Sequence, residues 1–574
     1  MKKTVLRIVC VVLCALMLTS LFACDNGGGN VEDEVFAVTA ENLAEYKIVV
    51  PDNLAVAFDD VAKTLRDAIL NITGNSIEIK TDLIYEGSEE TEYEIILGKS
   101  NRTVVSDFYK NVRNQDYGYA LVGKKILIIG DDENLLKRAV GLFKTYVLEN
   151  ASEKDALLRD GESKITVGGD YKYSEIKING VNIFEYTIVY PFSPSTTIEE
   201  KRVAEEFSKW LLINTGYTIP CVRDNVEKTA NEIQIGITNR ITDEMKADME
   251  SKISDDKYYV AKNGQMLWAC GNNVSTLSRA VNEIIASINA EGEIAIDAPI
   301  CKEMQNIEIS VMSYNVRGML DADKRDSDGV ITTIKEQNPD IFTAQEAVSS
   351  NDAQSAKWMS RFETALVKNG GYEAVKGFST GNYLAYNPIY YKKDKFELVS
   401  KGAKYLSDTP DKKNSKVDGS EYVRIATFAV LRDKETGIEF LVTCTHLDIA
   451  GYQVRTKQAT ILADLMGEYP LLPVVVCGDF NTDPSTTPVT TFKKNANVEY
   501  GADIAEAELT ELTKTVSTLN GEGQYVELGN KVIDYIFVSK SKITVQKYEH
   551  LDNKIGGRYP SDHLPVLANI TIYG

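Results

Sequence analysis

Apolar residues between position 307 and the C-terminus fall into short runs, and each run meets a polar or charged residue at one end. Apolar runs of this length, bounded by turn residues, are typical of buried strands. An unpaired buried carboxylate is costly, so polar groups at several strand ends predict a shared site at one rim of a sheet. The polar groups at the ends of these runs are Asn315, Glu346, His446, Asp479, Asn481, Asp534, Asp562 and His563.

The pattern upstream repeats itself at a spacing of about 140 residues. Each copy predicts a strand, an amphipathic helix, a strand pair and a second helix. In the first copy the helix is expected near residues 58–72, and the strand pair turns at Gly123. We therefore expect two small α+β domains of the same design. The matched blocks are 46–51 with 186–191, 73–74 with 215–216, 94–102 with 232–240, and 130–140 with 271–281.

The first residues form a targeting segment. Lys2, Lys3 and Arg7 precede an apolar stretch that is too short for a comfortable membrane span and ends just before Cys24. This segment resembles a bacterial lipoprotein signal with lipidation at Cys24, which implies a protein anchored on the extracytoplasmic face of the bacterial cell membrane. The expected divisions are a signal at 1–24, a flexible tether at 25–40, repeats at 41–172 and 173–302, and a C-terminal domain at 303–574.

The amino-acid composition narrows the range of possible substrates and ligands. The 574 residues carry a formal net charge of −21, which excludes a basic coat for nucleic acid and means that a polyanionic substrate needs a local basic patch or a cation. Eight cysteines are present, and the five beyond Cys24 are scattered, so they predict buried free thiols without a disulfide framework or zinc spacing. The oxygen-rich set at the strand ends suits a hard cation.

The ordered set of motifs resembles the endonuclease/exonuclease/phosphatase superfamily over residues 307–574. This resemblance implies an α/β fold, a four-layer α/β sandwich of two mixed sheets flanked by helices, preceded here by the two repeats. It also implies a metal-dependent phosphoric ester hydrolase that uses Mg²⁺, with Mn²⁺ as the alternative. The motifs are Tyr-Asn-Val at 314–316, Gln-Glu at 345–346, Thr-His-Leu at 445–447, Gly-Asp-Phe-Asn at 478–481, Asp-Tyr-Ile at 534–536 and Ser-Asp-His at 561–563.

The resemblance implies a role for each strand-end residue. Glu346 is expected as the main Mg²⁺ ligand, helped by Asn315, with Asp562 as a second ligand or a positioning group. Asp479 is expected to orient or deprotonate the attacking water, and Asn481 to hold a phosphate oxygen. The remaining roles are a base or phosphate partner at His563, oriented by Asp534, and a donor to the phosphate or leaving group at His446.

Two arginines and one departure from the family pattern complete the predicted site. Arg424 and Arg455 are expected either to bind phosphate or to form structural ion pairs, since a guanidinium fits both. Many relatives carry a Glu that supports the His of the Thr-His motif, where this sequence has Ala385. We expect Asn387 to substitute for it, or His446 to be less firmly oriented.

Several functions fit these features. The first is a surface-anchored phosphodiesterase of the extracellular nuclease kind, and a lysine cluster at 392–416 could guide a polyanion or form a solvated face. Phospholipid or sphingomyelin headgroups and inositol phosphates are the alternative substrates. The repeats resemble accessory domains found before the catalytic barrel of bacterial glycoside hydrolases, which implies a stalk or a glycan contact. The rival class is therefore a glycan- or wall-binding lipoprotein with an inactive catalytic-like domain.

Overall fold

The computed structural model describes residues 35–85, 89–149, 151, 154–192, 198–317, 327–347, 360–378, 386–515 and 531–574. The predicted signal, Cys24 and Ala385 lie outside these residues. The described residues divide into two compact units, one within 35–104 and 117–166 and the other within 105–116 and 167–574. No helix in the described part of the chain has the length and apolar character needed to cross a membrane.

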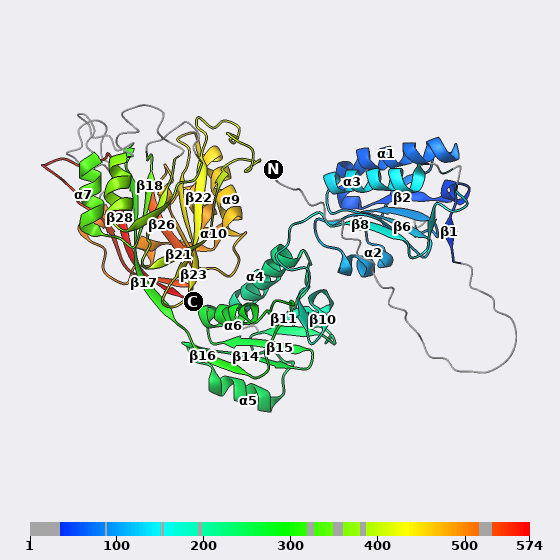
Figure 1. The fold of residues 1–574 in the computed structure, drawn as a ribbon, viewed down its shortest axis with the longest axis horizontal. Coiled ribbons are helices and arrows are strands. Elements are labelled where there is room, and N and C mark those ends of the chain that lie inside the picture. The colour runs from blue at the N-terminus through cyan, green and yellow to red at the C-terminus, as the bar shows by residue number, and fades with distance from the viewer. Residues whose placement is uncertain are drawn as a thin grey trace, which may run out of the picture. The chain divides into compact units, whose positions relative to one another are not determined.

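The first repeat is a six-stranded sheet, coloured blue to cyan in Figure 1, with strand order β3-β2-β4-β6-β5-β8. Helix α1 (Ala55–Thr73) buries Val61, Leu65 and Ile69 and ends at Gly74, whose φ of 72° suits a residue without a side chain. Helix α3 (Glu133–Phe143) is capped by Asp132, whose side chain accepts from the backbone N–H of Leu135. The strands are β2 (Lys47–Val50), β3 (Ile79–Thr81), β4 (Glu94–Leu97), β5 (Tyr117–Val122), β6 (Lys125–Ile129) and β8 (Ser163–Thr166).

The second repeat has the same design. Its sheet order is β12-β11-β13-β15-β14-β16, which matches the first sheet strand for strand. The helices are α4 (Ile198–Thr215), α5 (Asp243–Lys252) and α6 (Val274–Ala286), and α6 is capped by Asn273. The strands are β11 (Thr187–Tyr190), β12 (Cys221–Arg223), β13 (Glu232–Ile235), β14 (Lys257–Asn263), β15 (Met266–Gly271) and β16 (Ile300–Glu303).

The strand directions correct the α+β prediction for both repeats. Four strands of each sheet run parallel, and β5 with β8, or β14 with β16, completes it in antiparallel fashion. Parallel neighbours need a crossover connection, which α1 and α4 supply. The repeats are therefore two similar mixed α/β units.

One buried ion-pair cluster distinguishes the copies. In the first repeat the fully buried Glu94 lies 3.0–3.1 Å from nitrogens of Arg102, Lys80 and Lys125. In the second, Glu232 is 3.9 Å from Arg240. By strand register, Val222 and Met266 replace the two lysines.

The C-terminal region is built on two six-stranded sheets. Figure 1 shows α7 on one side of them and α9 and α10 on the other. One sheet has the order β19-β20-β18-β17-β28-β27 and the other β21-β22-β23-β24-β26-β25. The strands are β17 (Asn306–Asn315), β18 (Ile341–Gln345), β19 (Tyr372–Val375), β20 (Ile389–Lys392), β21 (Phe396–Tyr405), β22 (Ile425–Asp433), β23 (Glu439–His446), β24 (Val474–Asp479), β25 (Val498–Tyr500), β26 (Asp534–Ser539), β27 (Ile543–His550) and β28 (Val566–Tyr573).

The two sheets face one another across a continuous apolar core. Along β17, Ile309 and Val311 join Leu441 and Val475 of the facing sheet in that core. The alternate residues, such as Tyr314, pack outward in a second cluster with α7 (Ser327–Gln337). Apolar side chains of helices α9 (Tyr452–Met466) and α10 (Thr487–Ala496) also belong to the core cluster that the two sheets share. The period-two alternation of a strand therefore gives β17 two apolar faces.

The predicted free thiols are of mixed exposure. Cys444 and Cys477 are buried neighbours in register on the parallel strands β23 and β24, and burial raises the pKa of both thiols. Cys270 is also buried, whereas Cys221 is partly exposed and Cys301 is exposed. The prediction that all five are buried is therefore wrong for two of them, which lie on the outer strands β12 and β16 of the second repeat.

Candidate active site

Strand register brings three predicted residues side by side. His446 is the last residue of β23 and pairs with Asp479, the last residue of β24. Asp479 in turn pairs with Asp534, the first residue of the antiparallel strand β26. Backbone hydrogen bonding of the sheet thus holds an imidazole and two carboxylates at one rim, and all three side chains are buried.

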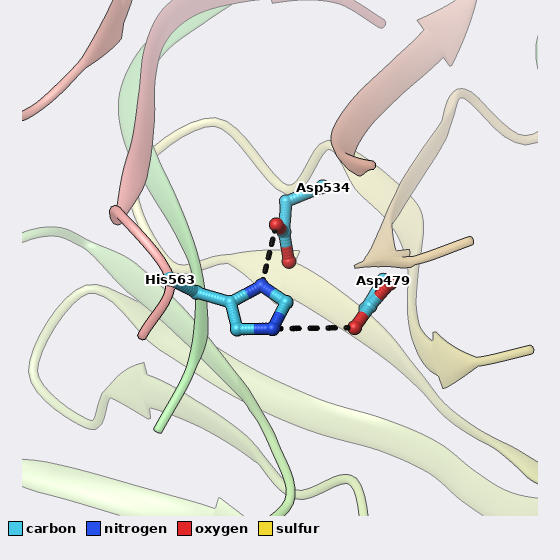
Figure 2. Close-up of side chains that lie close together, drawn as sticks. All are labelled: Asp479, Asp534 and His563. Atoms are coloured by element: carbon cyan, nitrogen blue, oxygen red, sulfur yellow. Dashed lines mark hydrogen bonds and ion pairs between the residues drawn. The ribbon is translucent and has the colours of Figure 1, made fainter. Parts of the chain in front are cut away.

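A second histidine closes the group from the last loop of the chain. His563 Nδ1 lies 2.8 Å from Asp534 Oδ2, and His563 Nε2 lies 3.8 Å from Asp479 Oδ2 (Figure 2). The ring thus stands between the two carboxylates, as Figure 2 shows. A carboxylate at Nδ1 fixes the ring and keeps Nε2 facing the site.

Asn315 connects this rim to the facing sheet. It ends β17, and its Nδ2 donates to Asp479 Oδ2 at 3.0 Å and to Glu346 Oε1 at 3.2 Å. Its Oδ1 accepts from the backbone N–H of Arg317 at 2.9 Å, which fixes the orientation of the amide. Asn315 therefore holds Glu346 and Asp479 together, whereas its predicted part in binding the metal stays a prediction.

Backbone conformation marks the site independently. Arg317, Glu346 and Asn481 have φ values of 44°, 52° and 51°. This left-handed region is uncommon for residues other than glycine, and asparagine tolerates it best. Strained residues persist where the surrounding contacts over-determine them, and they cluster at functional sites. Here each one stands one or two residues beyond a strand end, at the rim of the sheets.

His446 and Asn481 form a pair of their own. Asn481 Nδ2 donates to the Leu447 carbonyl at 3.0 Å and to His446 Nε2 at 2.9 Å, so Nε2 is an acceptor and the proton is on Nδ1. Burial, then Arg424 and His563, lowers the pKa of His446 well below 6.5, which agrees with a neutral ring. Donation from His446 to a phosphate, and the predicted phosphate contact of Asn481, stay predictions.

Burial and neighbouring charges shift the pKa values of several side chains in the site. Burial, followed by Asp534, raises the pKa of Asp479 to about 7. Burial alone would lower the pKa of His563, but Asp534, Asp562 and Asp479 outweigh it and raise the pKa well above 6.5. Burial raises the pKa of Glu346 as well. Crowded carboxylates of this kind are what a divalent cation would neutralise.

The donor chemistry therefore offers two alternative places for a cation. Ligand atoms of Asp479, Asp534 and His563 all lie within 4.8 Å of one another. Glu346 offers a second position, because it is a half-buried carboxylate whose oxygen meets only an amide nitrogen among the hydrogen bonds described for it. Since His563 Nδ1 is already engaged by Asp534, Glu346 is the better placed to hold a hard cation.

Asp562 is paired with an arginine that sequence reasoning missed. Arg317 Nη1 lies 3.0 Å from Asp562 Oδ2. Ser561 Oγ donates to the Asn315 carbonyl at 2.7 Å and accepts from the His563 N–H at 3.2 Å, which ties the last loop to β17. The signal for Arg317 was present in the sequence, because it stands two residues beyond the strand-end Asn315.

The two predicted arginines are placed differently. Arg424 is buried, with Nε 3.8 Å from Asp448 Oδ2, and its charge acts on Asp479 and Glu346. Arg455 donates through Nη1 to the carbonyls of the segment from Asp448 to Ala450, so its guanidinium fixes a loop. Arg424 is thus the arginine whose charge acts on both site carboxylates. Phosphate binding by either arginine stays a prediction.

The residue expected to replace the missing family glutamate makes another contact. Asn387 is buried, and its Nδ2 donates to the Ile425 carbonyl at 3.1 Å. Within the described residues, His446 Nδ1 has no hydrogen-bond partner. The structure therefore shows no support for His446 from Asn387, and the alternative of a less firmly held ring stays a prediction.

The buried carboxylate–imidazole group at the rim of the two facing sheets is chemically suited to metal-assisted hydrolysis. Residues 312–563 match the model of the Endonuclease/Exonuclease/phosphatase family, and the C-terminal half of the chain contains a domain of this family. Its members are metal-dependent phosphoester hydrolases. The region before residue 312 lies outside the match.

Individual relatives are distant. The Ccr4 3'-5'-exoribonuclease subunit of the CCR4-Not complex from Kluyveromyces lactis is 24% identical over 231 residues, 32% of this chain and 29% of that protein. Human nocturnin is 25% identical over 199 residues, 32% of this chain and 43% of its own length. The chain thus spans less than half the length of these curated relatives.

Solved structures are also similar to somewhat less than half of the chain. A family protein from Bacteroides thetaiotaomicron is 26% identical, with 47% of this chain and 97% of that chain covered and a TM-score of 0.40. A mannosyl-6-phosphatase from the same species is 26% identical, with 46% and 99% covered and a TM-score of 0.39.

Proposed function

We propose that this protein is a metal-dependent phosphodiesterase that hydrolyses a P–O bond by attack of a water molecule. The observation that carries this proposal is the pair of hydrogen bonds that Asn315 donates to Glu346 and to Asp479. They link a proposed cation ligand to a proposed proton-handling group. A structural role explains a single capped turn, but it gives no reason to bury Asp479 beside Asp534 and two imidazoles.

Each side chain has a distinct part in the proposed reaction. Glu346 would hold Mg²⁺, or Mn²⁺, and the bound cation would offset negative charge on the phosphate. Asp479 takes the proton of the attacking water, because its pKa of about 7 suits a general base near neutral pH. His563, kept charged by Asp534, presents Nε2–H to a phosphate oxygen or to the leaving group. Buried Arg424 adds a positive charge that acts on Asp479 and Glu346.

The experiment is hydrolysis of bis(p-nitrophenyl) phosphate with Mg²⁺ by the full chain, beside Glu346→Gln and His563→Ala. Loss of one acid–base group typically costs about 10²–10⁴-fold, and both variants should lose at least a hundredfold. His550→Ala is the matched control, because His550 is the one remaining histidine of the sequence and lies on β27. Undiminished turnover in both site variants, or in excess EDTA, would overturn the proposal.

The lysine cluster at 392–416 bears on which class of substrate the site would accept. Lys395 pairs with Asp340 and Lys404 with Asp411, and Lys392 donates to Asn338. Lysines paired with a carboxylate, as Lys395 and Lys404 are, attract a polyanion weakly. A small phosphate ester is therefore the second candidate, and p-nitrophenyl phosphate and inositol phosphates assayed beside DNA, RNA and sphingomyelin separate the two.

We further propose that the protein is anchored through a lipid at Cys24 on the outer face of a bacterial membrane, with the two repeats as a stalk. The support is the order of charged, apolar and small residues before Cys24. Labelled fatty acid should enter the parent and be absent from Cys24→Ser, which should leave the membrane fraction. Equal labelling of both would overturn the anchor. Retention of a labelled soluble glycan by the repeats would favour a binding role over a stalk.

A further inference from the structure

The turn that carries Arg317 is built into the site. Its backbone N–H donates to Asn315 Oδ1 at 2.9 Å, and its φ of 44° departs from the conformations that arginine prefers. The same turn therefore fixes the amide that touches Glu346 and Asp479 and also sets the direction in which the Arg317 side chain leaves the backbone. Contacts with residues of the site, such as Asn315, therefore position Arg317.

The guanidinium of Arg317 meets an acid of the same rim. Nη1 is 3.0 Å from Asp562 Oδ2, and Asp562 directly precedes His563. The Arg317 side chain is 39% exposed, whereas that of Arg424 is 1% exposed. Of these two cations near the carboxylates, Arg317 is thus the one that an incoming solute can reach.

A permanent cation on Asp562 changes what that carboxylate can do. A carboxylate that binds a divalent ion gives its lone pairs and negative charge to the metal. Here the charge is already met by a guanidinium that does not lose its proton in proteins. A second dication at Asp562 would have to displace Arg317 and would be repelled by it.

We propose that Arg317 takes the place of a second divalent cation: it occupies Asp562 and contacts a phosphate oxygen of the substrate, so that the site binds one divalent ion, at Glu346. This inference rests on the proposed function and adds its cation count and a substrate-binding residue. A guanidinium has five N–H donors in a planar fork, so it serves a carboxylate and a phosphate at once. The ligand class is a phosphate oxyanion.

The test counts bound metal and measures phosphate affinity without turnover. Mn²⁺ binding to the full chain is titrated by electron paramagnetic resonance, and inorganic phosphate binding to the Mn²⁺-loaded protein by calorimetry. The unaltered chain should bind one Mn²⁺. Arg317→Ala should bind two, because Asp562 is released, and its dissociation constant for phosphate should rise at least tenfold. Arg361→Ala is the matched control, since Arg361 is similarly exposed and paired with Asp328 outside the site.

Three results would overturn the inference: two Mn²⁺ in the unaltered chain, one Mn²⁺ in Arg317→Ala, or phosphate affinity in Arg317→Ala within twofold of the parent. Arg317→Lys, which keeps the charge and loses the fork, should keep one Mn²⁺ and bind phosphate with intermediate affinity. Should Arg317→Ala unfold, Arg317→Gln gives the same readouts. If the metal and phosphate results hold and no ester is hydrolysed, the proposed function fails and this inference stands.

Discussion

Replacing Asp479 by asparagine should stabilise the metal-free protein at alkaline pH while it removes catalysis. Asp479 is buried beside Asp534, and its pKa rises from an ordinary 3.8 to about 7. The folded state therefore holds this proton more tightly than the unfolded chain. A carboxyl of this kind makes stability fall as pH rises from about 4 to about 7, and above that the loss is complete.

The magnitude follows from the same values. One unit of pKa corresponds to about 1.4 kcal/mol, so ionised Asp479 costs roughly 4 kcal/mol at pH 8 and about half of that or less at pH 5. Asparagine has no such cost. It leaves one nitrogen facing Asn315 Nδ2, a loss of about 1–3 kcal/mol that does not depend on pH. The gain of Asp479→Asn over the parent should thus be roughly 2–3 kcal/mol larger at pH 8 than at pH 5.

The assay is urea unfolding of parent and Asp479→Asn in EDTA at both pH values, followed through the transition that Mg²⁺ shifts in the parent. Asp433→Asn, a buried aspartate at the far end of β22, is the matched control for loss of an acid. A difference between parent and variant that is the same at pH 5 and pH 8 would refute the reasoning. So would a variant that loses stability relative to the parent as pH rises.

Four further outcomes are expected. Glu94→Gln should destabilise the first repeat by about 3 kcal/mol in urea at pH 7, because it leaves buried cations unpaired, and Glu232→Gln should cost clearly less. The pKa of Glu94 is lowered to about 2, since its cations outweigh burial, so the stability that it contributes should be lost as pH falls below about 4 towards 2. Asn315→Ala should lower kcat/KM about 10–100-fold with circular dichroism unchanged, because Glu346 and Asp479 lose their shared donor. Leu441→Ala, in the core between the sheets, should cost about 2–5 kcal/mol, and a cost under 1 kcal/mol would contradict the packing described.

The strand ends could be predicted because they are local. An apolar run that stops at Asn315, His446 or Asp479 predicts a strand and its last residue, and β17, β23 and β24 end at those positions. The exact neighbour of each residue could not be predicted. That Asp479 pairs with both His446 and Asp534 depends on register between segments far apart in sequence, which a one-residue slip would change.

Other features of the structure could not be predicted from the hydrophobic pattern of the sequence. Strand β3 reads Ile-Lys-Thr, which is too short and too polar to show as a buried strand, and so the parallel arrangement of the repeats was missed. Arg455 lies in the first turn of α9, but sequence does not tell whether its guanidinium reaches the site or the carbonyls of the preceding loop. The direction of a long side chain depends on tertiary contacts.

The neighbouring thiols of Cys444 and Cys477 have a consequence for the way the chain is made. In the native core they are shielded and held as thiols by burial, so they are inert once the two sheets have closed. An unfolded chain in an oxidising compartment exposes both, together with Cys221, Cys270 and Cys301. Cross-links among these thiols would block closure of the sheets. Formation of the native core should therefore require β23 and β24 to pair before their thiols oxidise, and refolding should be more efficient with a reductant present.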